Sequence, residues 1–263
     1  GGFDLIAQGM SGLMYVTGEK GKPPVKVGYP VLDIGAGMYA AIGILSALQA
    51  RTKDGLGQYV DVSLFETGVA WGLMAAGNYF ADGSIQGRMG SASPQNAPYQ
   101  AYDVKNGSFV VGTGNDELWI KFCEIFGIAH LTERAEYKDN ASRVANQEEL
   151  TKEIQEALKD YTVKECIDKL DAAGIPGGPI SNIKEVLEDP QVIARDLILT
   201  MKHKKAGEIK NVACPIKLSG TPTSVRRSPP LLGENNGEIL KELGYSQEEI
   251  KTLEQSGVIG RSE

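Results

Sequence analysis

The residue of this sequence best placed for chemistry is Asp33, an acid that comes just before a long segment, residues 35–51, that is small or apolar on nearly every side. An Asp at a helix start commonly caps it, because its carboxylate accepts a hydrogen bond from a free backbone N–H. The positive end of the helix dipole also favours the ionised carboxylate, which is a competent nucleophile. Gly35 and Gly37 would let a bulky substrate approach the backbone closely. These two interpretations are compatible, and neither alone names a reaction.

Other kinds of active site have little support. The chain shows no P-loop, no metalloprotease His motif and no nucleophile elbow. Its three cysteines, Cys123, Cys166 and Cys214, are far apart, and its only histidines are His130 and His203. We therefore expect no metal site and no Ser or Cys triad. Unpaired cysteines of this kind suit a reduced, cytoplasmic compartment.

The composition limits the class of protein. The chain has 263 residues, enough for one large domain or two modest ones, with 41% hydrophobic and 23% charged residues. A net charge of −7 argues against a general nucleic-acid surface, although it does not exclude a local site for an anionic ligand. We see no apolar run near the ~20 residues of a membrane span and expect no membrane partner. The chain starts without Met, in the middle of an apolar pattern, which suggests a fragment.

The elements around Asp33 are mostly apolar. Helical spacing covers residues 4–16, and the segment 35–51 has no polar face, so we expect a helix buried on most of its circumference. Alternation of polar and apolar residues predicts a strand at 58–63, and a second apolar helix is expected at 64–80. A stretch rich in Gly, Ser, Pro and Asn, residues 82–98, is the first plausible domain boundary.

The rest of the chain reads as a compact α+β unit followed by an arm. Two strands at 99–104 and 108–112 flank an Asn-Gly turn, and Asn115 or Asp116 is a candidate cap for a helix at 117–126. Amphipathic helices fit 146–159 and 162–173, with a shorter one at 183–187. Extended segments are expected within 197–218, and two short helices close the chain at 237–243 and 246–256. Ser246 with Glu249 forms a capping box before the last one.

Several short motifs follow one another across nearly the whole chain. They are GFDxxxQxxSG at 2–12, TGE at 17–19, GYPVLDIGAG at 28–37, RTKxGxGQ at 51–58 leading to VDVSLFE at 60–66, DVKNG at 103–107, GND at 114–116, GIPxGP at 174–179, EDP at 188–190 and PPLLGE at 229–234. In content and order they resemble the class III CoA-transferases, the CaiB/BaiF type that includes formyl-CoA transferase. The resemblance is specific for the family and not for a substrate.

The resemblance implies a mechanism centred on Asp33. In that family the matching aspartate attacks an acyl-CoA thioester to give an anhydride, CoA returns to form an aspartyl-CoA thioester, and an acceptor carboxylate then collects the CoA. A second active-site acid lies 29 positions earlier, where this chain has Asp4, which could equally be a helix cap. CoA would be a substrate, with no tightly bound cofactor and no metal.

The resemblance also implies substrate-binding positions. Gln8, Gly35 and Gly37 lie in the matching motifs, and a mobile glycine-rich loop over the site should fall at 87–93, where this chain keeps only Gly87 and Gly90. The expected partners are an acyl-CoA, with succinyl-CoA suggested, and a carboxylic acid.

The family fold implied is an open α/β large domain with a smaller α+β domain, in two subunits interlocked like rings. This chain would supply the end of the large domain (1–82), a linker or active-site loop (83–96), the small domain (97–190), and a returning arm with C-terminal helices (191–263). The N-terminal half, with most CoA contacts, would be missing. The fragment alone is then expected to bind CoA poorly, to be inactive and to pack its long helix incompletely.

Two alternatives stay open. An α-methylacyl-CoA racemase would resemble the chain equally well around Asp33, but it needs a proton-transferring His where this chain has Phe3. The second is a non-catalytic subunit or truncated remnant of a CoA-transferase that pairs with a catalytic homologue, as a heteromer in place of a homodimer. Such a subunit would be expected to lose the aspartate, which is present as Asp33. The transferase is favoured.

Overall fold

A computed structural model describes residues 2–260 and divides the chain into two compact units, Gly1–Ile180 and Ser181–Glu263. The division falls inside the predicted small domain, whose proposed boundaries stay a prediction. Each unit is described by itself below.

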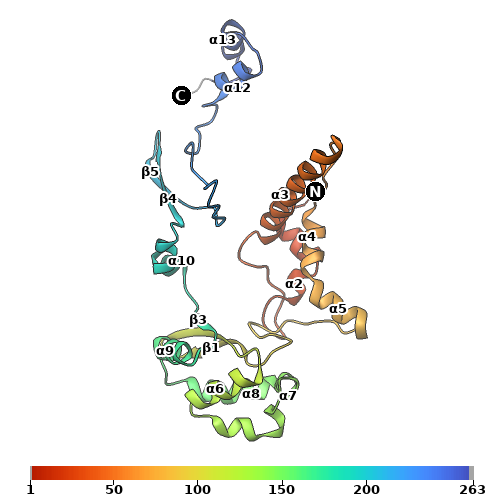
Figure 1. Ribbon diagram of the computed structural model, residues 1–263, viewed down its shortest axis with the longest axis vertical. Coiled ribbons are helices and arrows are strands. Elements are labelled where there is room, and N and C mark those ends of the chain that lie inside the picture. Colours follow the sequence, from red (N-terminus) through yellow and green to blue (C-terminus); the bar gives the residue numbers. More distant parts are fainter. Residues whose placement is uncertain (1, 261–263) are drawn as a thin grey trace. The chain divides into compact units, whose positions relative to one another are not determined.

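The first unit begins with five helices, of which Figure 1 labels α2, α3, α4 and α5. They are α1 (Asp4–Met10), α2 (Leu13–Val16), α3 (Val31–Asp54), α4 (Leu64–Trp71) and α5 (Leu73–Asp82). The helix expected at 4–16 is interrupted by Gly12, whose φ of 87° leaves the helical region, and the one expected at 64–80 is interrupted at Gly72. Both regions are therefore helical as predicted, but each is two helices.

The predicted strand at 58–63 is wrong. Residues 55–63 have no regular structure, and no strand within residues 2–260 pairs with them. A strand needs a neighbour to bond its backbone groups, and the alternating pattern alone supplies none. The segment instead leads into α4, where the Ser63 side chain caps the helix by accepting from the N–H of Glu66.

The second part of the first unit is α+β, as predicted. Strands β1 (Tyr99–Val104) and β2 (Gly107–Gly112) form the expected hairpin, and β3 (Gly177–Pro179) adds to β2, so the order is β1-β2-β3, all antiparallel. The connecting elements are α6 (Asp116–Ile125), η1 (Ala129–Glu133), η2 (Ala135–Tyr137), α7 (Asn140–Ala145), α8 (Gln147–Leu158) and α9 (Val163–Ala173). Asn115, not Asp116, caps α6 by accepting from the N–H of Leu118.

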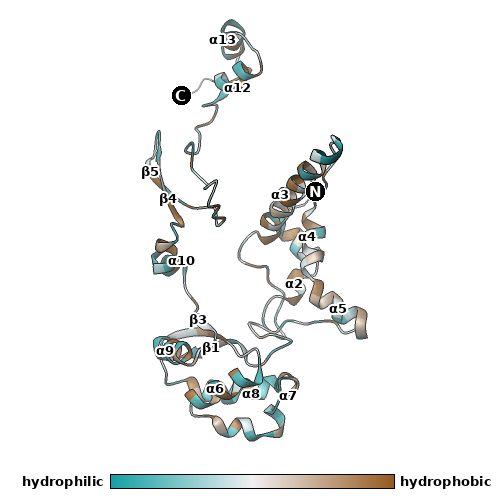
Figure 2. Cartoon of the chain, in the orientation of Figure 1, coloured by the Kyte–Doolittle hydropathy of each residue, from teal (hydrophilic) through white to brown (hydrophobic). Residues whose placement is uncertain are grey.

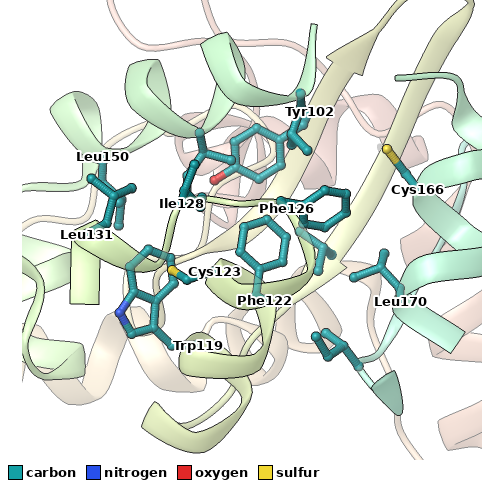
Figure 3. Packing of buried hydrophobic residues seen from close by; sticks show 14 of the residues in the cluster. Tyr102, Trp119, Phe122, Cys123, Phe126, Ile128, Leu131, Leu150, Cys166 and Leu170 are labelled. Carbon is teal, nitrogen blue, oxygen red and sulfur yellow. The ribbon is translucent and has the colours of Figure 1, made fainter. Parts of the chain in front are cut away.

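One hydrophobic core holds these elements together (Figure 3). Phe122 packs its ring 4.9 Å from that of Phe126, and Trp119 stacks beside Phe122. Helix α9 contributes Cys166 and Leu170, both fully buried. This core is independent of α3, so the α+β part supplies a packed platform of its own.

The second unit contains six elements within residues 181–260. They are α10 (Ile183–Glu188), α11 (Pro190–Ala194), β4 (Ile198–His203), β5 (Gly207–Val212), α12 (Asn236–Glu242) and α13 (Gln247–Gln255). Strands β4 and β5 pair antiparallel around a short turn, as expected for this extended region. The capping box of Ser246 and Glu249 is confirmed at the start of α13.

Candidate active site

Asp33 lies in the first turn of α3, and its side chain is exposed. It is the third residue of the helix, not the residue before it, because α3 begins at Val31 with Pro30 as N-cap. The interpretation of Asp33 as the N-cap is therefore wrong, because Pro30 holds that position and Asp33 lies inside the helix. No side-chain cap bond is made at Pro30. The carboxylate stays at the positive end of the α3 dipole, where a negative charge is stabilised.

Asp4 supplies the missing bond to this helix end. Its Oδ1 accepts from the N–H of Leu32 at 2.9 Å, and its Oδ2 accepts from Nε2 of Gln8 at 2.6 Å. Asp4 does not cap its own helix, for which Phe3 is the N-cap. The structure thus places the two predicted acids at one end of α3, with Asp4 bonded to the residue that precedes Asp33.

Gln8 is fully buried, and both ends of its amide are occupied. Besides the bond to Asp4, its Oε1 accepts from the N–H of Val27 at 2.9 Å. A substrate-binding role for Gln8 stays a prediction, and it would require the amide to leave these partners.

The two glycines after Asp33 have different surroundings. Gly35 is buried against α4, where a Cβ would lie 2.5 Å from Cζ2 of Trp71 and 3.0 Å from Cγ2 of Thr67. Packing against α4 therefore explains the glycine at position 35. A Cβ on Gly37 would meet nothing within 4 Å, so a ligand has room beside it.

The predicted glycine-rich loop is tied to an earlier segment of the chain. Arg88 donates through Nε to the carbonyl of Lys22 and through Nη1 to that of Tyr15, both at 2.9 Å, and lies over the Tyr15 ring. The N–H of Gly90 donates to the carbonyl of Gly18, and its φ is 63°. A Cβ on Gly87 would meet nothing within 4 Å. These contacts place the loop on residues 15–22, while its movement over the site stays a prediction.

A pocket of about 600 Å³ lies among α2, α4, α5 and the loop at 84–95. Its wall is mostly apolar, and none of the residues that line it is charged. Trp71 lines it and also contacts Gly35, so the pocket adjoins the helix that carries Asp33. The buried hydroxyl of Ser11, also in its wall, has no hydrogen-bond partner within the described chain. Such a pocket suits an uncharged part of a ligand.

Sequence reasoning assigned no role to Trp71, Ser11 or Arg88, although Ser11 lies in the motif at 2–12. Arg88 was within reach of sequence reasoning, as the one charged residue of the loop at 87–93, but its carbonyl partners lie 66 and 73 residues earlier. Trp71 carried no signal beyond its place in an apolar helix.

Helix α3 is not buried on most of its circumference, which corrects that expectation. Of its residues only Leu32 and Gly35 are buried, and large apolar side chains such as Ile42 and Leu45 are more than half exposed. The ribbon of α3 in Figure 2 is brown (hydrophobic) over much of its length and teal (hydrophilic) at one end. A helix that is apolar on nearly every side is expected to be covered by other parts of a protein. The described residues leave most of α3 uncovered.

Among residues 2–260, α3 is also long and apolar enough to cross a membrane by length and composition alone. The expectation that no run approaches this length is wrong, because Gly and Ala extend the apolar segment between the larger side chains. Core helices of soluble proteins meet the same criterion. No group of three or more His, Cys, Asp or Glu within the described residues is arranged to hold a metal ion.

Comparison with known proteins identifies the family of this chain. The model of CoA-transferase family III matches residues 1–236. The chain belongs to CoA-transferase family III. It is 34% identical over its whole length to succinyl-CoA:glutarate CoA-transferase of Homo sapiens, covering 60% of that protein. It is 33% identical to succinyl-CoA:mesaconate CoA-transferase of Haloarcula hispanica, with 92% of this chain and 61% of that protein aligned.

A solved structure confirms the family fold. The CaiB/BaiF family protein from Brucella suis superposes with a TM-score of 0.76 at 34% identity, covering 92% of this chain and 63% of that one. The predicted fold, part of the mixed α/β CoA-transferase architecture, is therefore confirmed. This family III chain spans about 60% of the length of the curated relatives it matches.

Proposed function

We propose that this chain is part of an enzyme that transfers CoA from an acyl-CoA, with succinyl-CoA as the first candidate, to a carboxylic acid. The observation that carries the proposal is the exposed carboxylate of Asp33 in the first turn of α3, in a chain of CoA-transferase family III. The choice of donor is supported by relatives whose names specify succinyl-CoA. We further propose a cytoplasmic enzyme whose subunits interlock as a dimer.

The first half of the reaction loads CoA onto Asp33. A carboxylate oxygen attacks the thioester carbonyl carbon, the C–S bond breaks, and CoA leaves as a thiolate from a mixed anhydride. The thiolate then attacks the Asp33 carbonyl carbon, which releases the donor acid as a carboxylate and leaves an aspartyl-CoA thioester.

The second half runs the same steps with the acceptor. Its carboxylate attacks the aspartyl-CoA thioester and releases the thiolate, which then attacks the acceptor carbonyl of the new anhydride. The products are the acceptor thioester and the free Asp33 carboxylate, so atoms and charges balance. Both intermediates are prone to hydrolysis, and a site that excludes water protects them.

The proposal is tested on the complete gene product that carries this chain. We expect it to transfer CoA from succinyl-CoA to glutarate or mesaconate, and we expect hydroxylamine trapping with mass spectrometry to find the adduct on Asp33. Asp33→Ala should lower turnover on the order of 10³-fold or more, as loss of a covalent nucleophile does.

Persistent turnover in Asp33→Ala would contradict the proposal. Exchange of an α-deuterium label without CoA transfer would instead identify a racemase. That outcome is disfavoured by Phe3, which occupies the position of the racemase His and carries no titratable group.

A further inference from the structure

One carboxylate joins helix α1 to the start of the helix that carries Asp33. Asp4 accepts from the backbone N–H of Leu32 with one oxygen, at 2.9 Å, and from the Gln8 amide with the other, at 2.6 Å. Leu32 directly precedes Asp33 in the first turn of α3. The bond to Leu32 therefore fixes the backbone next to the proposed nucleophile.

The pattern of donors and acceptors in this network permits one orientation of the Gln8 amide. The N–H of Val27 is a donor, so the Gln8 amide must turn Oε1 towards it, at 2.9 Å. Nε2 then donates to position 4, which must accept there and must also accept from Leu32. Both oxygens of a carboxylate do this, whereas the amide of an Asn would present one donor to another. Since Gln8 is fully buried, water does not replace a lost partner.

Packing holds the same turn from the other side. Leu32 is fully buried, and its Cδ1 lies 3.1 Å from where a Cβ on Gly68 of α4 would be. Gly35 lies against Trp71, also of α4. The Asp33 backbone thus lies between two packed residues, while its carboxylate remains exposed.

From this geometry we propose that Asp4 and Gln8 are positioning residues, which hold the first turn of α3 so that the Asp33 carboxylate is aimed at the thioester carbonyl. The proposal rests on the proposed function for its chemical consequence. It assigns Asp4 no proton transfer and no contact with substrate. Placement matters because a displacement of about 1 Å costs on the order of 100-fold in rate.

A swap of the two side chains separates positioning from direct chemistry. In Asp4→Asn, the new amide N–H₂ faces the N–H₂ of Gln8. In Gln8→Glu, two carboxylates face each other at the same contact. The double variant D4N/Q8E restores every bond, because Asn Nδ2 donates to Glu, Glu accepts from Val27, and Asn Oδ1 accepts from Leu32.

The experiment measures kcat, KM and the rate of hydroxylamine-trapped adduct formation on Asp33 in the complete gene product. Each single variant should lose about 10-fold to 100-fold in kcat with KM changed less than about 3-fold, because the turn loses its hold without losing a substrate contact. The double variant should recover to within about 3-fold of the wild-type kcat.

Hydrogen exchange of the peptide spanning residues 27–36 supplies a readout that does not depend on activity. Exchange should rise in both single variants and return to the wild-type level in the double variant. This holds even if the wild type forms no adduct on Asp33, so failure of the proposed function and failure of the positioning role are distinguishable.

Three results overturn the positioning role. They are a fully active D4N, a folded D4N/Q8E as inactive as D4N, and a D4N/Q8E that does not fold. The second would show that the Asp4 carboxylate acts in the chemistry itself. If D4N alone does not fold, the double variant decides the question in the same way.

Discussion

Arg143 is fully buried beside the core of the α+β part, and its contacts determine how much free energy of unfolding is lost when it is replaced. Its Nε donates to the carbonyl of Ala97 at 2.7 Å, its Nη1 to that of Tyr137 at 3.2 Å, and its Nη2 to Oδ1 of Asp116 at 2.7 Å. The guanidinium also lies over the ring of Trp119. Two partners are thus backbone carbonyls, and the third is a carboxylate whose side chain is 55% exposed.

Arg143→Met should destabilise the protein mainly through the two carbonyls. Met refills most of the side-chain volume, but each carbonyl left without a donor costs about 1–3 kcal/mol, for a total of about 2–4 kcal/mol after the gain from apolar packing. Asp116→Asn keeps an acceptor for Nη2 and removes only the charge at a half-exposed site, which costs about 1 kcal/mol or less. We expect the first substitution to cost at least about twice as much as the second.

Urea unfolding followed by tryptophan fluorescence measures both values. The chain has two tryptophans, so a Trp71→Phe background leaves Trp119, directly under Arg143, as the reporter. A loss of stability in Asp116→Asn equal to or greater than that in Arg143→Met would refute the reasoning. It would show that the ion pair with Asp116, and not the two hydrogen bonds to backbone carbonyls, supplies most of the stability that the buried guanidinium contributes.

Two further predictions concern the same α+β part. Burial, with a hydrogen bond to Glu153, raises the pKa of Tyr137 from 10.0 to about 12. Because the folded protein then keeps a proton that the unfolded chain loses, stability should fall by about 1.4 kcal/mol per unit as the pH rises between these values. Urea titrations from pH 9 to 12 measure this slope, and Tyr137→Phe should reduce it. An equal slope in that variant would contradict the raised pKa of Tyr137. Gly177→Ala should cost about 1–3 kcal/mol, because its Cβ would lie 2.5 Å from Cδ1 of the buried Leu170 and 3.0 Å from the carbonyl of Val110. Thermal unfolding should show almost no loss in the matched Gly178→Ala, whose Cβ would meet nothing within 4 Å, and equal losses would contradict the packing argument.

Local features of the fold could be predicted from the sequence, because their causes lie within a few residues. The Asn115 cap and the Ser246–Glu249 capping box each depend on a spacing of three residues. The β1–β2 hairpin is specified by its turn and its two flanking segments. In each case one short stretch of chain contains both partners of the interaction.

Interactions between distant segments could not be predicted. Asp4 and Leu32 are 28 residues apart, and nothing in the sequence shows that one bonds the other. The true start of α3 at Val31 moved Asp33 inside the helix, which removed its capping role. The alternation at 58–63 favoured a strand, but whether a partner strand exists is a property of the whole fold.

The candidate site shows the same difference between local features and contacts of distant segments. The chemical type of Asp33 and its place at a helix start were evident from the residues, and the family resemblance drew attention to Asp4. The packing of Trp71 against Gly35 and the hold of Arg88 on two carbonyls depend on side-chain directions in space. Such contacts leave no periodic trace in the sequence.

The length of α3 has a mechanical consequence for Asp33. A helix of 24 residues is a rod of about 36 Å, and Leu48 lies about 22 Å along it from the carboxylate. A part of the protein that packed on these exposed turns would also set the tilt of the helix, and with it the direction of the Asp33 carboxylate. Under the function proposed above, we expect turnover to change on substitutions several turns away from Asp33 that touch no substrate.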